Sequence, residues 1–135
     1  MKGAAIWSSQ VEIKSRTWSD WLAAHTSFMY PLHHAEGSIT LTPTSLTLEG
    51  HHKSNAFIKL EVEITKAQLI SATVGFDGVY TMGEERSLGM TYKPLIIHYR
   101  DVNGVEDVLY VGVDVSWTRF SNNQLWCNEI NAWLG

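Results

Sequence analysis

The sequence contains one cysteine, three prolines and no long hydrophobic run. Because Cys127 has no partner for an intramolecular disulfide, we expect a reducing, cytoplasmic location. Three prolines exclude a collagen-like or proline-rich chain. No stretch approaches the roughly 20 apolar residues of a membrane span, and segment 3–7 is too short for the hydrophobic region of a signal peptide.

Basic residues are also scarce, with 10 Lys and Arg against 14 Asp and Glu and a formal net charge of −4. This balance lacks the basic surface with which proteins hold nucleic acid, so we expect no such partner. The 44% of hydrophobic and 11% of aromatic residues are typical of a folded protein. A chain of 135 residues can bury one core of ordinary size and leaves no room for a second full domain.

The first 26 residues show no strong strand pattern and one short helical pattern. Four side chains follow the helical spacing i, i+3, i+4, i+7, namely Trp18, Trp21, Leu22 and His25. We therefore expect residues 1–26 to be an N-terminal extension whose short helix packs on a domain formed by residues 27–135.

From residue 37 the hydrophobic period changes to two, which indicates antiparallel β-structure. Segments 38–42 and 45–49 alternate apolar and hydroxyl side chains around Pro43, predicting a tight hairpin. The clearest strand, residues 58–64, places one kind of side chain on each face. Its apolar face, expected to be core, holds Ile58, Leu60, Val62 and Ile64, and its charged face holds Lys59, Glu61 and Glu63.

Three further β-rich runs precede the C-terminus. Residues 67–82 are rich in β-branched side chains around the turn dipeptide Asp77-Gly78. Segments 95–99 and 108–111 flank Asn103-Gly104, a second hairpin signal, and we expect both to be central strands.

The C-terminus returns to helical spacing. Its apolar stripe consists of Trp126, Cys127, Ile130, Trp133 and Leu134. Ser121 and Gln124 have the spacing of a capping box, and Phe120 and Leu125 that of a hydrophobic staple, so a helix should run from about 122 to 134. We expect Trp126, Ile130 and Trp133 to have structural roles on its buried face.

About seven strands followed by one amphipathic helix predict an α+β domain, an antiparallel β-barrel capped by the C-terminal helix. This order, the hairpin segment 37–50 and the Trp-containing segment 124–134 resemble the pleckstrin-homology (PH) superfold, in particular bacterial PH-like and GRAM domains. The resemblance covers residues 27–134, and it implies that Trp126 is the helix tryptophan that packs against the barrel.

The resemblance leaves the function open, since this superfold serves phosphoinositide binding, peptide binding and scaffolding. Phosphoinositide-binding members use Lys and Arg side chains in the first loops. The first loop here, residues 32–36, has neither, and the next candidate loop offers only Lys53.

Two histidine pairs are the unusual feature, His33-His34 and His51-His52, expected in the first and third loops at one end of the barrel. The candidate ligand-binding residues are His34, His51, His52 and Lys53. Because adjacent residues on an extended segment point opposite ways, a zinc ion would lack ligands unless Glu36 joined them. Solvated loop histidines are the stronger interpretation, so we predict no metal and no cofactor.

Catalytic constellations are not apparent in the sequence. Cys127 belongs to the buried stripe and has no adjacent base, and Glu84-Glu85 falls in an irregular segment. Trp7 and Trp117 fit no predicted stripe, and either is a candidate for an exposed patch used in self-association. We therefore expect a non-catalytic adaptor domain that binds protein through a strand edge or aromatic patch, or binds itself. The alternative is weak binding of anionic lipid headgroups or small anions at the histidine-bearing end, favoured by acid.

Overall fold

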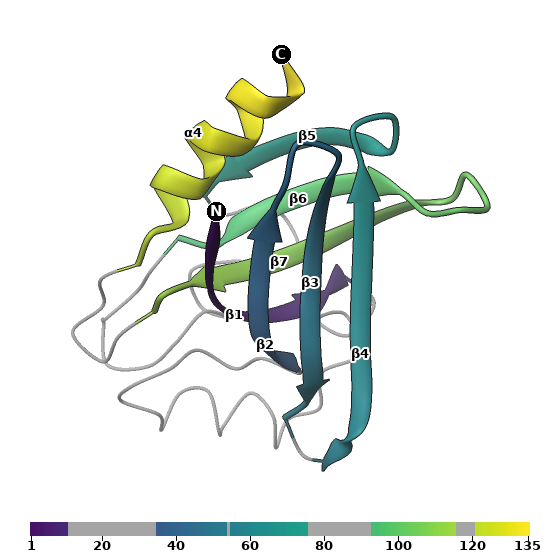
Figure 1. Ribbon diagram of the computed structural model, residues 1–135, viewed down its shortest axis with the longest axis vertical. Coiled ribbons are helices and arrows are strands. Elements are labelled where there is room, and N and C mark those ends of the chain that lie inside the picture. The colour runs from purple at the N-terminus through teal and green to yellow at the C-terminus, as the bar shows by residue number, and fades with distance from the viewer. Residues whose placement is uncertain (11–34, 54, 76–92, 116–120) are drawn as a thin grey trace.

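In the computed structural model, an antiparallel sheet and one C-terminal helix form the described part of the chain, which consists of residues 1–10, 35–53, 55–75, 93–115 and 121–135 (Figure 1). The elements are β1 (Lys2–Ser9), β2 (Ala35–Leu41), β3 (Ser45–His52), β4 (Asn55–Thr65), β5 (Leu69–Val74), β6 (Leu95–Arg100), β7 (Glu106–Val113) and α4 (Asn123–Leu134). The predicted α+β class is confirmed for these residues, and the sheet has seven strands because it includes β1, which the sequence did not predict. None of their helices is long and apolar enough to cross a membrane.

The seven strands lie in the order β4-β3-β2-β1-β7-β6-β5, so β4 and β5 are the two ends of the sheet. The predicted closed barrel is wrong, because closure needs a β4–β5 ladder. These strands are joined by a tight turn in which the Gln68 N–H donates to the Thr65 carbonyl (3.0 Å). Figure 1 shows β5 running across the direction of β4, a divergence that prevents ladder hydrogen bonds between them.

Strand β1 joins the two halves of the sheet. Its pairing with β2 runs from Lys2↔Thr40 to Trp7↔Ala35, and its pairing with β7 runs from Ala5↔Val113 to Ser9↔Leu109. The assignment of residues 1–26 to an extension is thus corrected for β1, and the short helix expected around 18–25 lies outside the described residues. Trp7 is 4% exposed and belongs to the core, so its proposed place in an exposed patch is also wrong, whereas Trp117 lies outside the described residues.

The turns of two hairpins have the chemistry that the sequence predicts. Between β2 and β3, the Thr42 N–H donates to the Ser45 carbonyl (2.9 Å). Between β6 and β7, Gly104 has φ +81°, a conformation that a residue with a Cβ rarely adopts. The Asp101 carboxylate accepts the Asn103 N–H (2.8 Å) and closes the same turn. Strands β6 and β7 each lie between two other strands, as predicted.

Two glycines set the close approach of β2 and β3. Gly37 and Gly50 are directly opposite each other. A Cβ on Gly37 would lie 2.0 Å from the Glu49 carbonyl oxygen, and one on Gly50 would lie 2.0 Å from that of Glu36. Neither position therefore accepts a side chain without a shift of the backbone.

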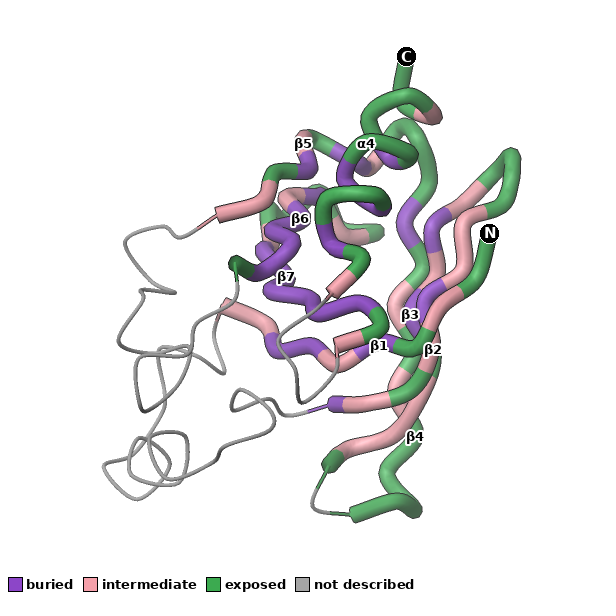
Figure 2. The backbone as a smooth tube through the Cα atoms, turned by 90° about the vertical axis from the view of Figure 1, so that its left-hand side faces the viewer, coloured by how far each residue is buried: buried purple, intermediate pink, exposed green. Residues whose placement is uncertain are grey.

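Helix α4 packs against β5, β6 and β7 (Figure 2). Trp126 and Ile130 are 1% and 0% exposed, and Trp133 is half-buried. The Trp133 indole N–H donates to the Pro43 carbonyl (3.2 Å), and the Lys66 amine lies 5.4 Å from the ring centroid. These contacts tie the C-terminal end of the helix to the turns of the β2–β4 half.

The start of α4 differs from the prediction. The N-cap residue is Asn122, which makes no side-chain capping bond, so the predicted Ser121–Gln124 capping box is wrong. Instead, buried Asn123 accepts the Val113 N–H at Oδ1 (2.7 Å) and donates from Nδ2 to the Lys93 carbonyl (2.7 Å). Hydrogen bonds to the sheet therefore fix this end of the helix.

Candidate interaction edge

The outer edge of β4, with which none of the described strands pairs, is the candidate site. The direction of its backbone groups follows from hydrogen-bond alternation. Ser45, an odd residue, forms a backbone hydrogen bond with Thr42 on the β2 side of β3. Because the direction alternates along the strand, odd residues of β3 bond to β2 and even residues bond to β4. The even residues of β3 pair with even residues of β4, as in Leu48↔Val62. The odd residues of β4 therefore direct their N–H and C=O groups away from β3.

Three consecutive odd residues carry this pattern along the middle of β4, namely Lys59, Glu61 and Glu63. At the two flanking odd positions, the backbone N–H already has a nearby side-chain acceptor. The Phe57 N–H donates to Asn55 Oδ1 and the Thr65 N–H donates to Gln68 Oε1, each at 3.0 Å. Among the described strands, none pairs with β4 on this side. The middle of β4 thus offers N–H and C=O groups in the arrangement that an added strand requires.

The apolar face of β4 changes in burial along the strand. Ile64 is fully buried, Val62 and Leu60 are half-buried, and Ile58 is 48% exposed. The predicted one-sided core face therefore holds from Ile64 to Leu60, since Val62 and Leu60 pack against the core, and it ends before Ile58. Figure 2 shows why, because the opposite end of β4 runs beyond the other strands. Phe57, at that end, is 94% exposed.

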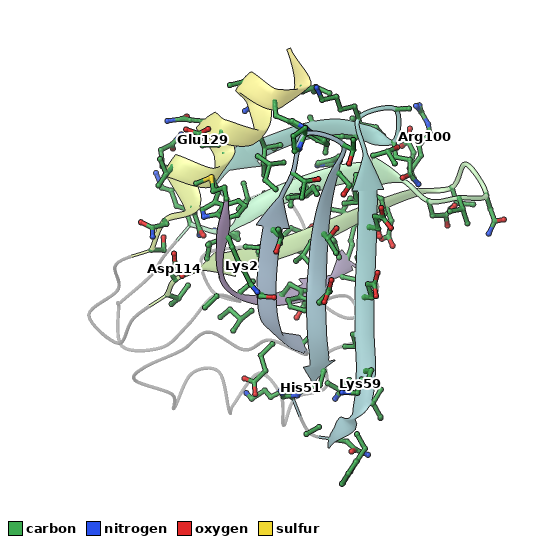
Figure 3. The ribbon with its side chains drawn as sticks, viewed as in Figure 1. Lys2, His51, Lys59, Arg100, Asp114 and Glu129 are labelled. Atoms are coloured by element: carbon green, nitrogen blue, oxygen red, sulfur yellow. The ribbon has the colours of Figure 1, made fainter. Side chains whose placement is uncertain are left out.

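The charged face of β4 carries both signs. Lys59 lies opposite His51 of β3, and Glu61 lies opposite Glu49 (Figure 3). Like charges directly opposite one another on a sheet are unfavourable, so Glu61 gains no partner from β3. This leaves a carboxylate suited to a cation on an approaching strand.

The histidines of β3 are in the strand itself and line different cavities. His51 borders a cavity of about 460 Å³ beside Glu36 and Gly37, and His52 borders one of about 270 Å³ beside Tyr99 and Asp107. The structure therefore does not bring the two rings to one point. His33 and His34 lie outside the described residues.

Carboxylates accompany the positive groups at this end of the sheet. The His51 Nε2 lies 3.8 Å from Glu36 Oε1, and its Nδ1 is 3.1 Å from the His52 carbonyl oxygen. Lys53 is exposed. Within the described ranges, no group of three or more His, Cys, Asp or Glu side chains is arranged to hold a metal ion.

Two buried groups have shifted pKa values. Burial raises the pKa of Tyr99 to about 12, and the negative charge of Asp107 and the hydrogen bond to it act in the same direction. The phenol oxygen lies 3.3 Å from the Asp107 carboxylate. Burial also raises the pKa of Cys127, partly offset by a hydrogen bond from Asn131. Both groups are thus held protonated at neutral pH, which suits a hydrogen-bond donor and not a nucleophile.

The residue types of β4 are visible in the sequence, but its place at the end of the sheet is not. That place depends on which strands pair, and the Tyr99–Asp107 contact likewise joins neighbouring strands β6 and β7.

Comparisons of the chain with protein-family models, curated proteins and solved structures found no match. The resemblance to the PH superfold stays a prediction.

Proposed function

We propose that this chain is a non-catalytic, PH-like interaction domain that binds an extended protein segment along the outer edge of β4. The observation that carries the proposal is the row of outward backbone groups at Lys59, Glu61 and Glu63. Main-chain hydrogen bonds to such an edge supply affinity, and alternate side chains supply specificity.

The surroundings of this edge support the proposal. β4 pairs with β3 in one register from Ser45↔Thr65 to His51↔Lys59, so this part of the strand is held in place before a partner binds, and the register shifts beyond Lys59. The exposed Phe57 ring adds an aromatic contact of the kind enriched at interfaces. The meander order and the buried Trp126 on a closing helix support the PH-like part of the proposal.

The charges at the histidine-bearing end favour a protein partner over a lipid headgroup. Each basic residue near a membrane surface contributes only about 1 kcal/mol to binding. Here Lys53 and Lys59 are accompanied by Glu36, Glu49 and Glu61. The headgroup alternative therefore requires protonated histidines, and membrane binding should be weak at neutral pH. A cytoplasmic location remains part of the proposal, supported by the cysteine content.

The test uses peptides selected from a random library on the immobilised full chain. We expect bound peptides to slow amide exchange at Lys59, Glu61 and Glu63. Glu61→Pro removes one outward N–H and should weaken binding at least tenfold, whereas Glu61→Ala keeps that N–H and should change it little. Circular dichroism of both variants checks that they fold.

Two results would contradict the proposal. Protection confined to other strands would place the interaction elsewhere, and equal loss in both Glu61 variants would exclude backbone pairing. Co-sedimentation with vesicles of phosphatidylcholine and phosphatidylserine at pH 7.5 and 5.5 tests the alternative. Tight vesicle binding at pH 7.5 would favour a membrane partner instead.

A further inference from the structure

We infer that one partner of the β4 edge is a second copy of this chain, paired antiparallel about a two-fold axis at Leu60. The inference rests on the proposed function and adds the identity of the partner and the register. Isologous pairing of this kind uses the same surface on both subunits and closes at a dimer.

Backbone direction restricts the registers. Only outward residues can exchange hydrogen bonds across the new ladder, so odd residues must lie opposite odd residues. With the axis at Leu60, Lys59 lies opposite the partner's Glu61, and Glu61 opposite the partner's Lys59. Both residue pairs exchange backbone hydrogen bonds and bring opposite charges together.

Neighbouring registers are less favourable because of charge. An axis at Glu61 also gives two Lys59–Glu63 pairs but places the Glu61 carboxylates opposite each other, and an axis at Lys59 places two amines together. An axis at Val62 sets Glu61 against the partner's Glu63. Like charges directly opposite are destabilising, whereas opposite charges stabilise a cross-strand pair. The register about Leu60 gives two opposite-charge pairs and no like-charge pair.

The apolar face of β4 fits the same register. Leu60 lies opposite the partner's Leu60, on the axis. Ile58 is 48% exposed and Leu60 and Val62 are half-buried, so each has surface left to cover. The two sheets would share a continuous apolar row across the axis, which is the usual source of association energy.

The other end of the sheet is less suited to this role. β5 has 6 residues, against 11 in β4, and helix α4 packs on it. Charges on an edge strand ordinarily protect against unwanted pairing. In β4 the change of sign between Lys59 and Glu61 selects one register for pairing and opposes the neighbouring ones.

Sedimentation velocity of the full chain over a concentration series tests the inference by charge reversal. Lys59→Glu and Glu61→Lys each create like-charge pairs in the homodimer, and each should weaken association at least tenfold. An equimolar mixture of the two variants makes every Lys59–Glu61 position complementary again and should restore the dimer. The double variant Lys59→Glu/Glu61→Lys should restore it as well.

A matched control separates register from net charge. Glu129→Lys makes the same charge change as Glu61→Lys on the exposed face of α4, away from β4, and should leave association unchanged (Figure 3). Restoration in the mixture also shows that the single variants fold. Association that is insensitive to both reversals, or not restored on mixing, would overturn the inference.

The outcome is distinguishable from failure of the proposed function. A wild-type chain that stays monomeric while selected peptides still protect β4 would overturn self-pairing alone. If the chain is monomeric and no selected peptide protects the β4 amides from exchange, both self-pairing and the proposed function are overturned.

Discussion

Trp126 offers the most direct test of the packing between helix and sheet. Its side chain is 1% exposed and belongs to the hydrophobic core together with Cys127 and Ile130 of the same helix. The Trp126→Ala variant removes the indole and keeps the helix backbone, since alanine has the highest helix propensity. The change therefore reports on core packing and not on helix formation.

The magnitude follows from burial. A buried tryptophan hides roughly 200 Å² of surface, and about 25 cal/mol per Å² converts this to about 5 kcal/mol. Alanine recovers part of that burial, while the cavity left behind adds a cost, so we expect a loss of about 3–5 kcal/mol. Since domains are stable by about 5–15 kcal/mol, much of the free energy of unfolding would disappear.

The assay is urea unfolding followed by far-ultraviolet circular dichroism, because the sequence has 6 tryptophans and fluorescence would mix their signals. With a slope near 2 kcal/mol per molar urea, the midpoint should fall by about 2 M. Trp133→Ala is the matched control and should cost about 1–2 kcal/mol, since that ring is half-buried with one hydrogen bond. Equal midpoints for wild type and Trp126→Ala would refute the placement of the indole in the core.

Three further predictions concern the glycine crossing and the two protonated groups. Gly37→Ala should destabilise by more than about 2 kcal/mol in thermal melts, because its Cβ would lie 2.0 Å from the Glu49 carbonyl oxygen; an unchanged melting temperature would exclude that close approach. The pKa of Tyr99 is raised in the fold from the ordinary 10.0 to about 12, so stability should fall as pH rises from about 10 to 12, and Tyr99→Phe should remove this part of the loss; an unchanged alkaline profile in the variant would count against it. Cys127, whose pKa is raised by burial, should react with a thiol reagent in urea and only slowly in the native state; rapid native labelling would show that the helix does not cover it.

Local sequence signals predicted the hairpins and the C-terminal helix. The Asn103-Gly104 turn needs a positive φ that glycine provides, and the helical stripe of α4 has one face to bury. Both signals arise within a few residues, so they do not depend on the rest of the fold. The capping box failed because Asn123, one position away, makes stronger tertiary contacts with Val113 and Lys93.

Strand β1 was missed because its surroundings hide the usual pattern. Trp7 and Ser8 are adjacent and point to opposite faces, yet they are 4% and 2% exposed. A strand buried on both faces shows no alternation of apolar and polar residues. The glycine, alanines and serines of this segment also have low strand propensity, so only its pairing with β2 and β7 makes it a strand.

The candidate site was predictable in its residues and not in its location. The alternation from Ile58 to Ile64 predicts a strand with one apolar and one charged face, and the structure has that strand. Whether the strand closes a barrel or ends a sheet depends on how β4 and β5 diverge after Thr65, which no local pattern encodes. The histidine pairs illustrate the same limit, since the sequence shows their spacing but not that His51 and His52 line separate cavities.

Strand β4 is also where pattern and burial disagree, and that disagreement has a physical meaning. A strand with apolar residues at alternate positions is expected to bury all of them, yet the exposed fraction rises from 0% at Ile64 to 48% at Ile58. Leu60 and Val62 pack in part against the core, whereas the exposed surface of Ile58 weakens solubility without adding to the core. Places where local pattern and observed environment conflict are often functional. The exposed end of this face therefore supports the proposal that β4 acquires a further strand, and the charge-reversal experiment identifies whether that strand comes from a second copy.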